Sequence, residues 1–245
     1  MKMTTISKEE FICLCEKCFK INGLEQFCEQ NTLNLLYQMV DHMLEINAVM
    51  NLTAITEPKD IILKHLADSL TVARFLPEHA HVLDVGCGGG FPSLPLAIAR
   101  PDLEITALDS TAKKTAYVSD SAKLLSLGNL KTLTGRAEEL AQSPEYRESF
   151  DFTVARAVAS LPVLSELCLP FVKIGGKMVA MKAKLDESES TNAHEMLGSL
   201  PFERHEFELK DELLTESRLI LVAKKQKHTP KEYPRAYAQI KKKPL

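Results

Sequence analysis

A strand followed at once by a glycine-rich turn constrains the fold of this chain more than any other feature. Residues 82–92 read VLDVGCGGGFP, an apolar strand with an internal acid, then a glycine turn and a proline that can open a helix. Glycines let the backbone turn tightly and approach a ligand with no Cβ in between. The pattern predicts the first crossover of a nucleoside-binding sheet, in which ligands lie at the carboxyl ends of the strands.

Short β-rich segments alternate with helical ones after residue 81. Strands are expected over 82–85, 104–108, 130–133, 151–155, 172–181, about 202–208 and 217–223, and helices over 92–100, 111–127, 136–142, 160–170 and 186–198. Such alternation predicts a parallel sheet covered on both faces. Because only a short polar segment separates the last two strands, we expect them to form an antiparallel pair at one edge.

The segment before this alternation has a different texture. Residues 7–76 read as helical throughout, with Pro58 in the first turn of a helix that ends before Pro77. We therefore expect an N-terminal helical extension over residues 1–78 and an α/β domain over 79–226. A basic C-terminal tail over 227–245 should pack on or near that domain.

Two classes of ligand compete for the glycine turn. A dinucleotide fingerprint needs a glycine where this chain has Phe91, and Asp84 would repel a pyrophosphate. S-adenosylmethionine carries an ammonium and a sulfonium group and no phosphate, so an acid at position 84 suits it. The spacing D-x-G-x-G-x-G thus favours S-adenosylmethionine. It predicts the Rossmann-like fold of a class I S-adenosylmethionine-dependent methyltransferase, with seven mostly parallel strands.

Further candidate contacts follow the later strands. Asp109 ends the second strand, where a carboxylate can accept both ribose hydroxyls of a nucleoside. Residues 135–138 follow the third strand, where the adenine edge should lie. Arg156 ends the fourth strand, and three roles stay open for it: holding the methionine carboxylate, an RNA phosphate, or a structural ion pair.

Charge is distributed unevenly along the chain. Residues 224–245 hold eight basic residues and one acid, whereas the remainder holds 22 basic and 32 acidic residues. A basic tail on an acidic body suggests a polyanionic partner, and a merely solvated tail is the alternative. Tyr233 and Tyr237 lie among these residues and could stack on unpaired bases. The candidate RNA contacts are Lys224, Lys225, Lys227, Arg235, Lys241, Lys242 and Lys243.

Several other classes of protein and site are not expected. The spacing Cys15-x-x-Cys18 could form half of a zinc site, but these cysteines lie on an apolar helical stripe, and we predict no metal and no disulfide. The first residues include two glutamates before any apolar run, so no signal peptide is expected. No uncharged apolar run is long enough to span a membrane. We expect a cytoplasmic monomer.

The order of the motifs is similar to that of the glucose-inhibited division protein B family. The motifs are NLTAIT (51–56), HLADSL (65–70), DVGCGGGFPSLPLAIA (84–99), GRAEEL (135–140), DFTVARAVASL (151–161) and TPKEYPRAYAQIKKKPL (229–245). The resemblance implies a guanine-N7 methyltransferase that uses S-adenosylmethionine and acts on 16S rRNA, free or within the small ribosomal subunit. It implies donor contacts at Gly86, Phe91, Asp109, Ala137, Glu138 and Arg156, to which the turn itself adds Asp84 and Gly88.

Three positions depart from the family pattern. Cys87 stands where the family has Ser or Thr, and Ser93 stands where it has Gly. The tail reads Arg235-Ala-Tyr-Ala where the family carries Gly, which affects the expected details of RNA contact. Cys87 and Ser93 are both small enough to preserve the glycine turn.

Guanine N7 exposes an unprotonated lone pair, so its methylation needs no general base, and we predict no catalytic acid or base. The Asn/Asp-Pro-Pro-Tyr/Phe motif for methylating exocyclic amines is absent after the fourth strand. A cytosine-C5 methyltransferase would need a nucleophilic thiol, but Cys168 lies in an apolar helical run and is expected to be a core residue. His65 and Asp68 invite a catalytic interpretation, but capping or a helix–sheet hydrogen bond is favoured. Two rivals remain: a non-catalytic RNA-binding or ribosome-assembly factor, and a methyltransferase acting on a small molecule or a protein.

Overall fold

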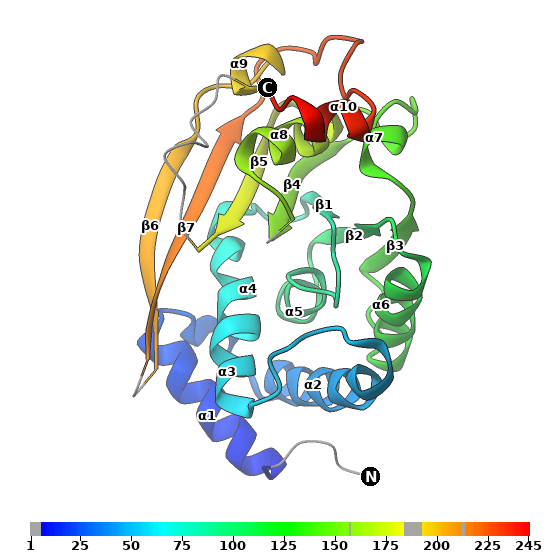
Figure 1. Cartoon of the computed structure of the whole chain (residues 1–245). Helices are drawn as coiled ribbons and strands as arrows, with labels where there is room; N and C mark the ends of the chain where they lie inside the picture. The colour runs from blue at the N-terminus through cyan, green and yellow to red at the C-terminus, as the bar shows by residue number, and fades with distance from the viewer. Residues whose placement is uncertain (1–5, 157, 184–192, 212–213) are drawn as a thin grey trace.

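A seven-stranded sheet forms the centre of the computed structural model, which describes residues 6–156, 158–183, 193–211 and 214–245 (Figure 1). The strand order is β3-β2-β1-β4-β5-β7-β6, with β1 to β5 parallel and β7 antiparallel to both of its neighbours. The strands are β1 (His81–Val85), β2 (Glu104–Asp109), β3 (Leu130–Thr134), β4 (Phe150–Arg156), β5 (Val172–Lys182), β6 (Glu203–Lys210) and β7 (Thr215–Lys224). This confirms the predicted fold class, and each predicted strand agrees with the structure to within about two residues.

The strand order reverses beside β1, which pairs with β2 on one side and β4 on the other. Asp84 is in register with Ala107 of β2 and Val154 of β4. The carboxyl ends of β1, β2 and β4 therefore meet at one edge of the sheet, at the switch point where open α/β sheets bind ligands.

Helices cover both faces of the sheet. They are α1 (Lys8–Ile21), η1 (Glu25–Phe27), α2 (Gln30–Met50), α3 (Pro58–Ile61), η2 (Ile62–Ala67), α4 (Asp68–Leu70), η3 (Thr71–Phe75), α5 (Ser93–Ala99), α6 (Ala112–Leu124), α7 (Ala137–Leu140), α8 (Leu161–Cys168), η4 (Leu169–Phe171), α9 (Ala193–Met196) and α10 (Tyr237–Lys242). Of the helix expected over 186–198, residues 186–192 lie outside the described residues, and α9 occupies only 193–196.

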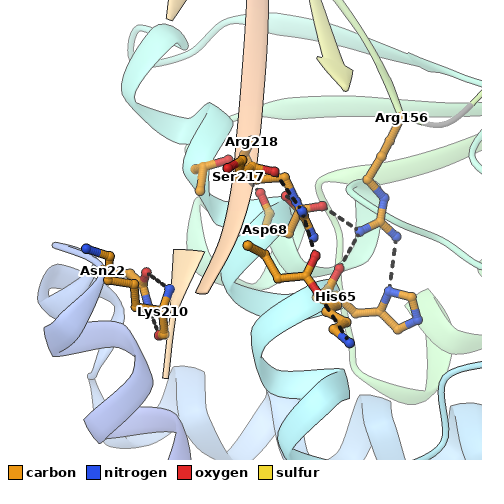
Figure 2. A network of polar contacts seen from close by, with 10 residues as sticks. Asn22, His65, Asp68, Arg156, Lys210, Ser217 and Arg218 are labelled. Atoms are coloured by element: carbon orange, nitrogen blue, oxygen red, sulfur yellow. Dashed lines mark hydrogen bonds and ion pairs between the residues drawn. The ribbon is translucent and has the colours of Figure 1, made fainter. Parts of the chain in front are cut away.

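The prediction of helix throughout residues 7–76 is wrong at two connections, 22–29 and 51–57, apart from the short turn η1. Gly23 and Asn51 adopt positive φ angles of 66° and 51°, a conformation that ends a helix. The Asn22 side chain donates to the carbonyl of Cys18 at 2.7 Å and exchanges two hydrogen bonds with the backbone of Lys210 (Figure 2). Asn22 thus ends α1 and fixes this helix to the end of β6.

Pro58 begins a helical run that continues to Phe75, as predicted, but its hydrogen-bonding pattern changes along the way. The six residues of η2 form a π-helix, between the α-helical segments α3 and α4. Such wide turns are rare and occur often at functional sites. This one contains His65, whose side chain lies against the glycine turn.

Two apolar cores lie on opposite faces of the sheet (Figure 1). Phe11 and Phe19 of α1, with Leu36 of α2, share the first core with the apolar residues of α5. Phe171 and Ile240 belong to the second core, around α8. The N-terminal helices thus bury their apolar faces against the same layer as α5.

The cysteines are free thiols in this arrangement. Cys15 and Cys18 point into the first core, and burial raises the pKa of Cys18 to about 12. Among the described residues, no three His, Cys, Asp or Glu side chains come together as ligands for a metal. None of the helices in that part of the chain has the length and apolar character needed to cross a membrane.

Candidate active site

A cavity of about 440 Å³ opens at the carboxyl ends of β1, β2 and β3. The structure brings seven of the eight predicted donor-site residues into its wall. They are Gly86, Gly88, Phe91, Asp109, Ala137, Glu138 and Arg156. The missing residue is Asp84. We call this cavity the donor pocket.

The glycine turn is tied to the neighbouring strand by backbone hydrogen bonds. The amides of Gly86 and Cys87 donate to the carbonyl of Leu108 at 2.8 and 2.9 Å, and the amide of Gly88 donates to Asp109 Oδ2 at 3.0 Å. Gly88 adopts a φ of +54°, and a Cβ there would point into open space, with no atom closer than 3.9 Å. The turn therefore presents bare backbone to the cavity.

Asp109 is fixed in position before any ligand binds. Its other oxygen, Oδ1, accepts a hydrogen bond from the amide of Thr111 at 2.9 Å, and the residue is buried, with 8% of its surface exposed. Lys114 places its ammonium 3.9 Å from Oδ2. A carboxylate held in this way at the end of β2 has lone pairs available for the hydroxyls of a ribose.

Asp84 does not line the donor pocket, so its predicted contact with the ammonium group is wrong. Its side chain is fully buried and accepts a hydrogen bond from the hydroxyl of Ser93, at the start of α5. Its second oxygen, Oδ1, has no hydrogen-bond partner in the protein. Burial raises the pKa of Asp84 to about 6, and the bond from Ser93 opposes that rise. Ser93, one of the departures from the family pattern, thus stabilises the buried Asp84 side chain next to the glycine turn.

Arg156 forms an ion pair and also lines the donor pocket. Its guanidinium donates to Asp68 Oδ2 at 3.1 Å and to the carbonyl of Lys64 at 3.0 Å. Arg218 of β7 donates to the other oxygen of Asp68 at 3.0 Å (Figure 2). The Asp68 carboxylate therefore bridges β4 and β7 from α4, which is the helix–sheet role favoured for it by the sequence.

His65 lies between the donor pocket and the ion-paired arginine. Its ring stacks on Phe91 with centroids 4.4 Å apart, and Arg156 donates to its Nδ1 at 3.3 Å. Burial and the neighbouring guanidinium lower the pKa of His65 to about 3, so the ring is neutral. Because Nδ1 accepts from an arginine, Nε2 carries the proton and donates to the Thr53 hydroxyl at 2.8 Å.

A second hollow of about 420 Å³ shares His65, Arg156 and Val158 with the donor pocket. Its remaining wall combines apolar side chains with the polar side chains of Lys64, Asp68, Lys182 and Arg218. The apolar ones are Ile55, Ala159, Leu164, Met181 and Ala183. We call this hollow the acceptor hollow. The two spaces meet at a wall made by η2, the end of β4 and the residues that follow it.

Some pocket residues were not predicted from the sequence. Thr53 and His65 lie in motifs of the family, but nothing in their spacing showed that the two side chains hydrogen-bond to each other or that His65 stacks on Phe91. Tyr237 also lines the donor pocket, and its ring centroid lies 4.4 Å from the guanidinium of Arg136, which belongs to the segment 135–138 predicted for the adenine edge. The sequence offers Tyr237 as a residue that could stack on unpaired RNA bases; only the path of the chain after β7 places it at the donor pocket.

The predicted RNA contacts separate into exposed and buried groups. Lys224, Lys227, Lys241, Lys242 and Lys243 are exposed. Lys225 is fully buried and donates to the carbonyl of Leu169 at 2.8 Å and to the hydroxyl of Thr229, so its predicted phosphate contact is wrong. Arg235 is engaged by the buried carboxylate of Glu166 at 2.6 Å.

Curated proteins with similar sequences carry one name. A protein of Clostridium novyi (strain NT), "Ribosomal RNA small subunit methyltransferase G", is 42% identical over 217 residues, which are 86% of this chain and 88% of that protein. A protein of Leuconostoc citreum (strain KM20) with the same name is 43% identical over 210 residues, 83% of this chain and 87% of its own length.

Solved structures resemble this one in fold. A S-adenosylmethionine-dependent O-methyltransferase of Thermotoga maritima superposes with a TM-score of 0.52 at 15% identity, over 78% of this chain and 72% of that chain. The YcgJ protein of Bacillus subtilis gives 0.54 at 13% identity, over 66% of this chain and all of the other. At these identities the likeness concerns the fold alone.

A family model also matches this sequence. The model describes GidB, "rRNA small subunit methyltransferase G", and matches residues 32–219, which include the glycine turn, Asp109 and Arg156. The matched region extends from α2 to β7. The chain therefore belongs to the GidB family of small-subunit rRNA methyltransferases.

Proposed function

We propose that this protein transfers a methyl group from S-adenosylmethionine to N7 of a guanine in 16S rRNA, in the cytoplasm. The observation that carries the proposal is the pair of adjoining spaces, a nucleoside-sized donor pocket and the acceptor hollow, which share Arg156 and His65. Membership of the GidB family supports the choice of rRNA as the methyl acceptor.

The walls of the donor pocket fit S-adenosylmethionine better than a dinucleotide. Asp109 offers carboxylate oxygens for ribose hydroxyls, and Gly88 leaves room for a close approach of backbone to ligand. Ala137 and Glu138 lie beyond β3, where they would meet the adenine edge. Arg156, at the opposite end of the pocket, is available to the methionine carboxylate on the side that Asp68 does not occupy.

The chemistry is a direct displacement. When bound, S-adenosylmethionine supplies an electrophilic methyl group: the N7 lone pair forms the new N–C bond as the C–S bond breaks, leaving a neutral thioether and a cationic base. The protein's task is alignment, which can contribute up to roughly 7–11 kcal/mol in well-oriented reactions. No proton has to leave N7 beforehand.

The acceptor base would enter the acceptor hollow. Its apolar wall can receive a flat base, and Lys64 and Lys182 at its edge can meet the phosphates beside that base. His65, neutral with a pKa of about 3, does not act as a general acid here; its ring stacks on Phe91 and accepts from Arg156 at the boundary between the two spaces. The neutral ring agrees with a reaction that needs no acid or base.

A methyl-transfer assay with three acceptors tests this proposal. Labelled S-adenosylmethionine is supplied with small subunits from cells that lack the protein, with naked 16S rRNA, or with total protein freed of RNA. We expect label in N7-methylguanine of 16S rRNA in at least one of the first two reactions. Label in the protein fraction, or tight binding of NADH without binding of S-adenosylhomocysteine, would contradict the proposal.

A further inference from the structure

The C-terminal segment is bound tightly to the α/β domain along its length. We call residues 227–243 the C-terminal strap. The guanidinium of Arg147 donates to the carbonyls of Thr229 at 2.8 Å, Pro230 at 3.1 Å and Tyr233 at 2.9 Å. Glu148 accepts from the amide of Thr229 at 2.7 Å. Five hydrogen bonds with two neighbouring residues, counting the pair between Glu148 and His228 at 2.5 Å, therefore fix the first half of the strap.

A buried carboxylate fixes the second half. Glu166 of α8 has no exposed surface, and its Oε1 accepts from both the backbone amide and Nε of Arg235, at 2.8 and 2.9 Å. Its Oε2 accepts from the same guanidinium at 2.6 Å. Five residues further on, Ile240 is fully buried in the second core. Tyr237, between these two anchors, has little freedom in where its backbone lies.

These anchors place the side chain of Tyr237 in the wall of the donor pocket. The ring centroid lies 4.4 Å from the guanidinium of Arg136, and both side chains line the cavity together with Ala137 and Glu138. Arg136 is held on its other side by Glu138, which accepts from its Nε at 2.8 Å. Tyr237 remains 37% exposed, so part of its side chain is accessible to a ligand.

We propose that Tyr237 is a donor-binding residue, which the C-terminal strap supplies to close the adenine end of the donor pocket. This inference rests on the proposed function, because it takes the ligand to be S-adenosylmethionine. An aromatic ring beside a stacked guanidinium provides a flat surface for a purine, and such contacts add free energy beyond buried area alone. The strap thereby serves the donor as well as any RNA that its lysines contact.

Calorimetric titration of the full chain with S-adenosylhomocysteine tests the inference. The variants are Tyr237→Ala, Tyr237→Phe and, as a matched control on the same helix, Lys242→Ala, whose side chain does not line the pocket. We expect Tyr237→Ala to weaken binding about tenfold, as expected from the loss of one aromatic contact. Tyr237→Phe and Lys242→Ala should bind as wild type does.

A second ligand localises the effect within the pocket. Methylthioadenosine keeps the adenosine end of the donor and lacks the amino acid, so Tyr237→Ala should weaken it by the same factor as S-adenosylhomocysteine. Unchanged binding by Tyr237→Ala, or an equal loss in Tyr237→Phe, would overturn this inference while leaving the proposed function intact. Failure of the wild type to bind S-adenosylhomocysteine would instead defeat the proposed function, and this inference with it.

Discussion

At the scale of single residues, the position of Asp84 before the glycine turn suggests a contact with the ligand, but the side chain is buried inside the protein. Asp84 is fully buried, accepts from Ser93, and leaves one oxygen without a partner. Its pKa of about 6 means that the folded protein keeps the proton at pH values where an unfolded aspartate has lost it. The folded state is therefore favoured below pH 4, and that advantage is lost as pH rises through about 6.

Replacing Asp84 by Asn should remove this pH dependence. We expect the stability of wild type relative to Asp84→Asn to fall by about 2 kcal/mol between pH 4 and pH 7, since each unit of pKa shift corresponds to about 1.4 kcal/mol and part of the effect is already lost by pH 4. Urea unfolding at a series of pH values measures this difference in the free energy of unfolding. The same substitution at Asp120, a surface carboxylate, serves as the control. A constant difference between wild type and Asp84→Asn would show that Asp84 titrates normally.

Gly88 and Gly23 form a matched pair for testing the turn. Both have positive φ angles, +54° and +66°, and a Cβ at either would meet no atom within 3.8 Å, so alanine should cost each a similar strain of about 1–2 kcal/mol. Only Gly88 lines the donor pocket.

Gly88→Ala should therefore weaken binding of S-adenosylhomocysteine at least about tenfold, because the added methyl group occupies the space through which the ligand approaches the backbone. Gly23→Ala should leave that affinity unchanged. Calorimetric titration compares the two variants. Equal affinities would mean that the ligand does not contact the turn.

At the scale of elements, Lys225 and the C-terminal strap that follows it hold two chemically different sets of cations. Lys225 and Arg235 are engaged by buried or partly buried acids, Glu148 at 3.4 Å and Glu166 at 2.6 Å. Burial lowers the pKa of Lys225 to about 8, and Glu148 opposes that change. Lys227, Lys231, the lysines of α10 and Lys243 are exposed, so these side chains of the strap are available to a polyanion.

Lysine variants should separate these two sets. Lys225→Met, which removes the buried charge and keeps much of the volume, should leave rRNA affinity of the folded protein unchanged. Lys242→Ala should weaken that affinity and reduce the slope of log affinity against log salt by about 1, because one phosphate contact is lost. Filter binding across a salt series gives both values. A larger loss of affinity in Lys225→Met than in Lys242→Ala would contradict this division.

At the scale of the whole molecule, one carboxylate connects the N-terminal helices to two strands of the sheet that are not neighbours, β4 and β7. Asp68 of α4 pairs with Arg156 of β4 and Arg218 of β7, and the three side chains are 8%, 15% and 13% exposed. Removing one partner of a buried pair is costly because the remaining charges keep their desolvation penalty. This carboxylate also sets the position of the arginine between the donor pocket and the acceptor hollow.

Asp68→Ala should lower the free energy of unfolding by about 3 kcal/mol, because it leaves two largely buried guanidinium groups without their carboxylate. Glu206→Ala, which breaks an exposed pair with Arg204, should cost less than about 1 kcal/mol. Urea denaturation of both variants checks the contrast. Similarly small losses of stability in the two variants would indicate that water solvates the charges of Arg156 and Arg218 once the Asp68 carboxylate is removed.

Most of the sheet was predictable from sequence because β1 to β5 and β7 contain apolar runs between turn residues, and the pairing of the last two strands followed from their short connection. The glycine turn and Asp109 were predictable for the same reason: both follow strands whose carboxyl ends must meet. The Asp84 side chain was not, since the sequence does not tell whether an acid in the strand faces the ligand or the helix behind it. The positions of the Tyr237 and Lys225 side chains depend on how the strap packs against distant parts of the chain, and no local sequence pattern indicates this.

The most direct test of the central claim is to map N7-methylguanine in 16S rRNA by chemical cleavage. RNA from a strain lacking this protein is compared with RNA from the same strain carrying the wild-type chain or Gly88→Ala. We predict one cleavage site that is absent in the deletion, restored by wild type and not restored by Gly88→Ala. An identical cleavage pattern with and without the protein would contradict the account.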